Sequence, residues 1–191
     1  IMDPLDYPNI DFVTLENPLE LSSECLKMLI KQTSFATAQS EKKPILTGVH
    51  FSLNDTKLNV TATDSFRLSQ TILEIDNYRP FNITIPNKSL DELSRAMDTY
   101  NDKVSLYFAT NKLLVKFKNV LFQTRLLDGN YPDTSRIIPP AFPIVIKFNK
   151  NELLDAVERV SLLSPREKMS TNELSYSIIK LTVSEDRNII L

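Results

Sequence analysis

The chain has 191 residues, of which 42% are hydrophobic and 24% are charged, and its formal net charge is −2. This balance excludes a disordered chain and is typical of a globular protein with one good core, or with one domain and part of another. Because the net charge is slightly acidic, composition alone announces no nucleic-acid partner, although an acidic face can offset a basic one.

Several chemistries are excluded because the necessary residues are scarce. A single cysteine, Cys25, rules out an internal disulfide and a cysteine-rich metal site. Two glycines are too few for a glycine-rich phosphate loop or a dinucleotide fingerprint, so no cofactor is predicted. The one histidine, His50, falls in an alternating strand pattern and is interpreted as a half-exposed strand residue. No run reaches the length of a membrane span and no signal peptide is visible, which predicts a cytoplasmic protein without membrane contact.

The first part of the chain predicts a linker, a helix and three strands. Pro4 and Pro8 punctuate the linker, and residues 12–15 form a possible short strand. Ser22 or Ser23 is predicted to cap a helix that runs to about Ala38. Its buried stripe is expected to comprise Leu26, Leu29, Ile30 and Thr33. The strands that follow are predicted at 45–53, 57–64 and 68–75.

The same order of elements then restarts twice. A strand at 81–85 precedes a helix that opens near Asn87 and ends near Met97, with an apolar stripe of Leu90, Leu93 and Met97. Strands at 103–109, 112–118 and 120–127 follow it. A third strand at 144–148 precedes a helix capped by Asn149 or Asn151, with Leu153, Val157 and Val160 facing inward. Two further strands are predicted at 178–183 and 188–191, joined by a turn at 185–187.

This internal repeat is the strongest signal in the sequence. The predicted helix caps Ser22, Asn87 and Asn149 recur at nearly equal intervals, and each follows a strand and precedes a helix. Strands joined by short turns pair in antiparallel fashion, and the helices must then cover one face of the sheets. The sequence therefore predicts an α+β fold built from repeated β-α-β-β-β halves.

Basic side chains accompany the predicted helices, among them Lys27, Lys31 and Lys88. Two interpretations stay open for them. They are either ordinary solvated helix faces or a surface that follows a nucleic-acid backbone without reading bases.

Two unusual stretches point to a shared binding surface. Residues 61–68 place an acid, Asp64, three positions before a base, Arg67, with Phe66 between them. Residues 128–136 combine Gly129 with a Tyr-Pro pair in a long loop. For Asp64 and Arg67 a structural ion pair and a binding role are equally good interpretations.

Three stretches carry a resemblance to a known family. In order, Lys43-Pro44-Ile45-Leu46-Thr47-Gly48-Val49-His50-Phe51, Thr61 to Leu68, and Gly129 to Arg136 closely resemble the beta subunit of bacterial DNA polymerase III, the replicative sliding clamp. The resemblance covers nearly the whole chain. It implies a linker at 1–10 from a missing first domain, a clamp middle domain at 11–140 and the incomplete start of a third domain at 141–191.

The family is non-catalytic, and its function follows from its shape. The resemblance implies a homodimeric ring whose helices line a hole around duplex DNA and whose antiparallel sheets form the outer wall. Such a ring binds DNA without sequence preference and tethers the polymerase, which raises processivity. The implied partners are duplex DNA, the polymerase catalytic subunit and the clamp loader.

The resemblance also assigns site residues. A cleft for linear peptides of polymerases and loader would take, on its middle-domain side, Lys43, Leu46, Thr63, Ser65, Phe66, Arg67, Leu68, Pro132, Arg136 and Ile137. The usual family residue at Phe66 is histidine, so one hydrogen bond at the rim is expected to differ. The DNA-facing set would be Lys27, Lys31, Ser40, Lys42, Lys88 and Arg95. Leu162 and Leu163 fall at the expected subunit interface.

Two rival functions belong to other classes. An enzyme would depend on Asp64, Arg67, Asp133 and Arg136 as a charged cluster, but the sequence offers it no nucleophile, metal constellation or phosphate loop. A repeat-built protein-protein interaction module that never touches DNA agrees with the acidic net charge. The position of the basic side chains on one surface discriminates between this module and a clamp.

Overall fold

The computed structural model describes residues 16–40, 42–76, 78–163, 179–183 and 189–190. The chain divides into two compact units, Ile1–Asp133 and Thr134–Leu191.

The first unit is made of two similar halves, which confirms the predicted β-α-β-β-β repeat. The first half contains β1 (Leu19–Ser22), α1 (Ser23–Thr33), β2 (Gly48–Asn54), β3 (Lys57–Thr63) and β4 (Leu68–Glu74). The second half contains β5 (Phe81–Pro86), α2 (Asn87–Ala96), β6 (Lys103–Phe108), β7 (Lys112–Phe117) and β8 (Val120–Arg125).

The two halves exchange their first strands. One four-stranded sheet has the order β1-β6-β7-β8, and the other has the order β4-β3-β2-β5. Strand β1 of the first half therefore pairs with β6 of the second, with Leu19 opposite Leu106, and β5 pairs with β2, with Gly48 opposite Pro86. Every described pairing is antiparallel. Each sheet is thus completed by the other half.

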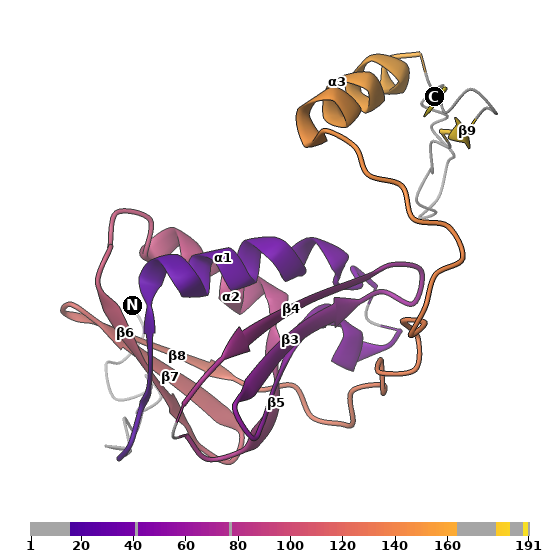
Figure 1. The fold of residues 1–191 in the computed structure, drawn as a ribbon. Coiled ribbons are helices and arrows are strands. Elements are labelled where there is room, and N and C mark those ends of the chain that lie inside the picture. The colour runs from indigo at the N-terminus through magenta and orange to yellow at the C-terminus, as the bar shows by residue number, and fades with distance from the viewer. Residues whose placement is uncertain (1–15, 41, 77, 164–178, 184–188, 191) are drawn as a thin grey trace. The chain divides into compact units, whose positions relative to one another are not determined.

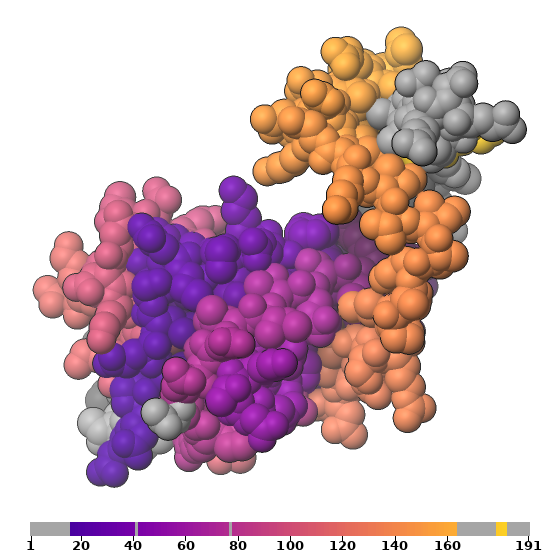
Figure 2. All heavy atoms as spheres, viewed as in Figure 1, coloured from indigo at the N-terminus to yellow at the C-terminus, as the bar shows by residue number. Residues whose placement is uncertain are grey.

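Both helices lie on the same side of the sheets and pack beside each other (Figure 1). The predicted inward stripes are confirmed: Leu26, Leu29, Ile30 and Thr33 of α1 are buried, as are Leu90, Leu93 and Met97 of the second helix and its cap. They pack on the apolar faces of the strands in one core. Side chains of α1, β3 and β4 close over that core on the face shown in Figure 2.

Helix ends differ from the prediction in two places. The Ser22 hydroxyl caps α1 by accepting a 3.1 Å hydrogen bond from the Cys25 N–H, as predicted. The helix ends at Thr33 rather than near Ala38, because the Ser34 carbonyl accepts both the N–H and the hydroxyl of Thr37 and tightens the chain into a 3-10 turn. Asn87 is the first helical residue and not the cap, and its side-chain amide instead donates to Asp91 at 3.4 Å.

The strand predicted at 45–53 begins only at Gly48. Residues Pro44–Thr47 form a 3-10 helix, with the Thr47 hydroxyl donating to the Pro44 carbonyl at 2.7 Å. Proline at the first position favours such a turn because its φ is already helical and its nitrogen has no hydrogen to donate.

The second unit contains α3 (Lys150–Ser161) and the antiparallel pair β9 (Thr182–Val183) and β10 (Ile189–Ile190). Asn149 caps α3 by accepting the Asn151 N–H at 2.9 Å, which confirms one of the two predicted caps. The inward residues Leu153, Val157 and Val160 are half-buried.

The strand predicted at 144–148 is wrong, because these residues have no regular structure and Ile144 is 76% exposed. In the first unit an opening strand pairs with the other half, and the described residues of the second unit offer no such partner. The strand predicted at 12–15 and the turn predicted at 185–187 lie outside the described residues.

Gly48 marks a close approach between the halves. A Cβ at this position would lie 2.6 Å from the Ile85 carbonyl oxygen and 2.7 Å from Leu127 Cδ1. The nearest atom belongs to the backbone of the paired strand, which cannot move aside cheaply.

We therefore expect Gly48→Ala to lower the free energy of unfolding by about 1–3 kcal/mol, and Gly48→Val to lower it further, because overpacking displaces the paired backbone. Urea unfolding followed by circular dichroism measures both. A Gly48→Ala protein with the same urea midpoint of unfolding as the native protein would contradict the close approach.

Candidate functional site

The turn between β3 and β4, residues 64–67, is closed by one carboxylate. Oδ1 of Asp64 accepts the N–H groups of Phe66 and Arg67, both at 2.9 Å, and Oδ2 accepts the Nε–H of Arg67 at 3.0 Å. An aspartate that caps the following backbone in this way builds a tight turn without help from glycine. The turn presents Phe66 with 86% of its surface exposed.

The electrostatics of this turn favour an ionised Asp64. Desolvation alone would raise the pKa of the Asp64 carboxyl, but the backbone N–H groups of Arg67 and Phe66 and the charge of Arg67 outweigh it. The pKa therefore lies below its ordinary value.

Thr63 connects the turn to the sheet. Its hydroxyl donates to the Arg67 carbonyl at 2.7 Å and accepts the Ser65 N–H at 3.1 Å. Between them Ser65 adopts a φ of 80°, a left-handed conformation that non-glycine residues rarely occupy. Such a conformation persists where surrounding bonds impose it, so the turn is a fixed feature of the fold.

Arg67 forms the structural ion pair that its sequence context allowed, while its binding role stays a prediction. It forms the ion pair with Asp64, yet its side chain is 55% exposed. Its guanidinium carbon also lies 5.9 Å from the ring centroid of Phe35. The ion pair with Asp64 thus holds the Arg67 guanidinium next to the exposed ring of Phe35.

Sequence analysis missed Phe35. The residue follows α1 in the 3-10 turn Ser34–Ala36, and its ring is 58% exposed. The available signal was its position outside the buried stripe of α1, where a large aromatic side chain has no core to enter.

A second connection joins residues 128–132 to the same place. The Tyr131 hydroxyl accepts the Thr63 N–H at 3.0 Å, and its ring stacks on His50 with centroids 4.4 Å apart and planes at 6°. Nδ1 of His50 lies 3.0 Å from the Thr84 hydroxyl. His50 is half-buried as predicted, but its aromatic partner was not foreseen because the two residues are far apart in the sequence.

Burial controls the titration of this pair. It lowers the pKa of His50 to about 4, so the ring is neutral near pH 7. It also raises the pKa of Tyr131 to about 12, against a smaller lowering by the Thr63 N–H bond. The hydroxyl therefore stays protonated.

The structure brings some of the predicted cleft residues together. Thr63, Ser65, Phe66, Arg67 and Leu68 form one continuous corner, and the Tyr131 bond to Thr63 ties the segment of Pro132 to it.

The other predicted cleft residues lie in different settings. Leu46 is 3% exposed and belongs mostly to the interior, while Lys43 is exposed at the start of its 3-10 helix. Arg136 and Ile137 belong to the second unit, where both are exposed.

The predicted DNA-facing residues differ in what they can offer. Lys31, Ser40, Lys42 and Lys88 are exposed. Arg95 is also exposed and pairs with Glu92 at 2.8 Å. Such a pair is worth little at a surface and can exchange partners.

Lys27 has a structural task that sequence analysis did not predict. Its Nζ donates to the carbonyl oxygens of Met97, Asp98 and Tyr100 at 3.2–3.3 Å. These carbonyls follow the C-terminus of α2, where the helix dipole favours a cation. The Lys27 side chain therefore joins α1 to the end of α2.

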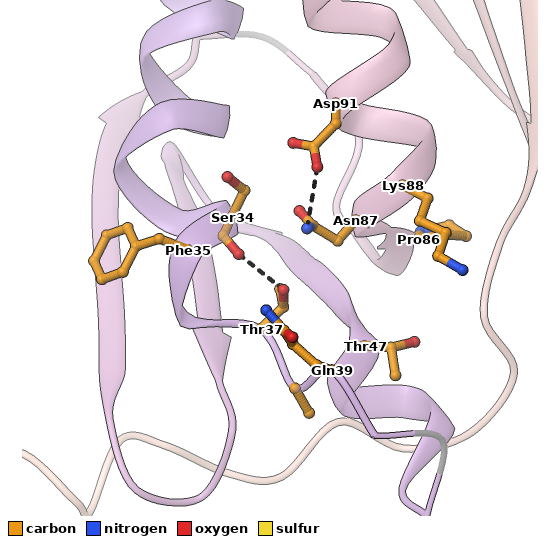
Figure 3. Close-up of a pocket in the computed structure, with 10 residues that line it drawn as sticks. Ser34, Phe35, Thr37, Gln39, Thr47, Pro86, Asn87, Lys88 and Asp91 are labelled. Atoms are coloured by element: carbon orange, nitrogen blue, oxygen red, sulfur yellow. Dashed lines mark hydrogen bonds between the residues drawn. The ribbon is translucent and has the colours of Figure 1, made fainter. Parts of the chain in front are cut away.

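A pocket of about 540 Å³ lies between the 3-10 turn after α1 and the first turn of α2 (Figure 3). Its lining mixes apolar and polar side chains, and the polar ones include Thr37, Thr47, Asn87 and Asp91. Phe35 borders it, but the Phe35 ring points away from the other lining side chains. The pocket is thus separate from the corner formed by residues 63–68.

Within the described residues no group of three or more His, Cys, Asp or Glu side chains could hold a metal ion. No helix in this part of the chain is long and apolar enough to cross a membrane. Leu162 and Leu163 follow α3 and are 80% and 87% exposed. The fold and the site define an α+β repeat scaffold with a preformed surface corner.

Comparison with known proteins identifies this scaffold. The family model of the DNA polymerase III beta subunit, central domain, matches residues 20–133. The chain is 42% identical over 174 residues to the beta sliding clamp of Streptococcus pneumoniae, covering 90% of this chain and 46% of that protein. It is 40% identical over 176 residues to that of Bacillus subtilis, covering 91% and 47%.

A solved structure agrees. The DNA polymerase sliding clamp of Bacillus subtilis superposes with a TM-score of 0.81 at 36% identity, covering 99% of this chain and 51% of that one. The chain belongs to the family of bacterial beta sliding clamps, the beta subunits of DNA polymerase III, and has their fold. It spans about half the length of these relatives.

The turn at 64–67 yields a pH-dependent prediction. Asp64→Ala removes the acceptor of two backbone N–H groups and is expected to cost about 1 kcal/mol of unfolding free energy, as loss of a helix cap does. Asp64→Asn keeps an acceptor oxygen and is expected to cost less.

Since the folded pKa of Asp64 lies below the ordinary value of 3.8, the charge stabilises the fold above that pH and the gain is lost as pH falls through the folded pKa. The stability difference between native protein and Asp64→Asn should therefore shrink between pH 7 and pH 2 in urea titrations. A difference that grows on acidification would refute the assignment.

Proposed function

We propose that the intact protein is the processivity factor of the bacterial replicative DNA polymerase. It forms a ring around duplex DNA and binds linear peptide motifs of the polymerase catalytic subunit and of the clamp loader. Family membership over residues 20–133 supports this proposal. The observation that carries it is the preformed corner at residues 63–68, in which one carboxylate and one hydroxyl fix an exposed aromatic and a cation.

The proposal includes a domain assignment. Residues 1–10 are a linker from a first domain, residues 11–140 are the clamp middle domain, and residues 141–191 begin the third domain. The division of the chain after Asp133 lies close to the second of these boundaries.

Processivity needs no reaction chemistry and no cofactor. A closed ring prevents the escape of DNA, so its contacts with phosphates can be weak, screened by salt and blind to sequence. A peptide tether then holds the polymerase at high effective concentration near the primer end. The protein acts in the cytoplasm and is not itself an enzyme.

The peptide cleft is proposed within the first unit. Leu68 and Pro132, with a small exposed part of Leu46, supply an apolar floor. Arg67 supplies a polar rim, with Thr63, Ser65 and Lys43 around it. An apolar pocket with a polar rim suits a short peptide anchored by large side chains. Phe66 replaces the histidine that is usual in the family and makes this rim more apolar.

The DNA surface consists of the helices. Both helices lie on one side of the sheets (Figure 1). Lys31 on α1 and Lys88 on α2 are exposed. Acidic side chains such as Glu92 lie beside the basic side chains, which keeps the attraction for phosphates weak. A homodimeric ring would be closed through the exposed Leu162 and Leu163.

The first test measures how a fluorescent peptide binds to the intact protein. The peptide begins with glutamine and ends in Leu-Phe. We expect saturable binding that Leu68→Asp abolishes and Pro132→Ala weakens, since both remove apolar contact. Fluorescence anisotropy measures the affinity.

Ile72→Asp is the matched control, because Ile72 lies on the same strand, β4, four residues after Leu68, and is 57% exposed. It should bind the peptide as the native protein does. No binding to a folded native protein, or equal loss in Ile72→Asp and Leu68→Asp, would overturn the proposed cleft.

The second test concerns DNA. Lys31→Glu combined with Lys88→Glu should weaken binding to duplex DNA. It should also reduce the slope of log affinity against log salt concentration by about 1.8, since each lost phosphate contact removes about 0.9.

Lys57→Glu combined with Lys116→Glu makes the same charge change on strands β3 and β7. This control should leave the slope unchanged. Equal slopes for the two double variants would contradict a DNA surface on the helices and favour an interaction module without DNA binding.

A further inference from the structure

We propose that Tyr131 is a positioning residue for the peptide cleft. Its side chain holds the next residue, Pro132, near the corner at residues 63–68. This inference deepens the proposed function and rests on it. The relevant geometry lies entirely within the first unit.

The segment after β8 is first held by two backbone hydrogen bonds. The Leu126 N–H donates to the Asn111 carbonyl and the Leu127 N–H donates to the Thr84 carbonyl, both at 2.9 Å. Beyond Leu127, Asp128, Gly129 and Asn130 are exposed, and Gly129 has a φ of 117°. The chain therefore leaves the sheet at Leu127 and makes a free turn before Tyr131.

Tyr131 is the next attachment. Its hydroxyl accepts the Thr63 N–H at 3.0 Å, and its ring lies flat on His50 at 4.4 Å. Both contacts are made by the side chain of Tyr131. Because Pro132 is the next residue in the chain, this side chain helps to set the position of Pro132.

His50 is itself fixed. It lies on β2, the central strand between β3 and β5, and its Nδ1 is 3.0 Å from the Thr84 hydroxyl on the β5 side. Burial lowers the pKa of His50 to about 4, so the stacked ring is neutral near pH 7. A side chain held by the sheet thus supports the ring of Tyr131.

The bond to Thr63 reaches the other part of the cleft. Thr63 is the last residue of β3, and its hydroxyl donates to the Arg67 carbonyl at 2.7 Å. Thr63 therefore binds Tyr131 by donating its N–H to the tyrosine hydroxyl, and it fixes the turn through its own hydroxyl. The two motif stretches found in the sequence meet at Thr63, and Tyr131 joins them.

The variant Tyr131→Phe tests this role because it removes the hydroxyl and keeps the stacked ring. We expect peptide affinity of the intact protein to fall about fivefold, the loss that corresponds to one hydrogen bond of about 1 kcal/mol. Anisotropy with the same fluorescent peptide measures it.

Tyr100→Phe is the matched control. The Tyr100 hydroxyl donates to the Lys103 carbonyl at 2.9 Å, beyond the C-terminus of α2. This variant therefore also loses one hydrogen bond between a tyrosine hydroxyl and the backbone. We expect a similar loss of thermal stability and an unchanged peptide affinity. Loss of affinity in both variants would show a general stability effect and overturn the positioning role.

A double variant separates positioning from packing. If Tyr131 acts through Pro132, Tyr131→Phe should weaken binding in the native background and have little further effect in Pro132→Ala. Fully additive losses would overturn this route. The amide resonance of Thr63 should shift in Tyr131→Phe, which reports the broken bond directly.

The outcomes also distinguish the two proposals. Absence of peptide binding to the native protein refutes the cleft itself. Native binding together with an unchanged affinity of Tyr131→Phe refutes the positioning role and leaves the cleft intact.

Discussion

The need of every extended strand for a hydrogen-bonded neighbour governs this fold. Neither half of the first unit completes its own sheet, because β1 pairs with β6 and β5 pairs with β2. Exchange of the first strands makes the two halves mutually dependent and places α1 and α2 side by side over one core. The close approach at Gly48 follows from the same exchange, since β2 and β5 come from different halves.

The candidate site arises where elements of this framework end. The turn after β3 and the loop after β8 are distant in sequence, yet both return to Thr63. A corner made by side chains that satisfy nearby backbone groups is rigid before any ligand arrives, so binding has less ordering entropy to overcome. The corner therefore suits a partner that is itself a flexible peptide.

Local patterns predicted much of this. The apolar period of α1, the Ser22 cap and the repeated order of elements were readable because each depends on near neighbours. Contacts across the fold were not: the stack of His50 on Tyr131, the exposed Phe35 beside Arg67 and the capture of Lys27 by carbonyls beyond α2 all join distant residues. The cap expected at Asn87 failed because Pro86 already occupies that position.

Lys27 differs electrostatically from the exposed lysines of the same two helices. Dissolved ions screen the charges of Lys31 and Lys88 strongly, but they screen less the attraction between the Lys27 ammonium and the three carbonyl oxygens that it contacts directly. Raising the ionic strength would therefore weaken the proposed attraction of Lys31 and Lys88 for a polyanion more than the link between the two helices.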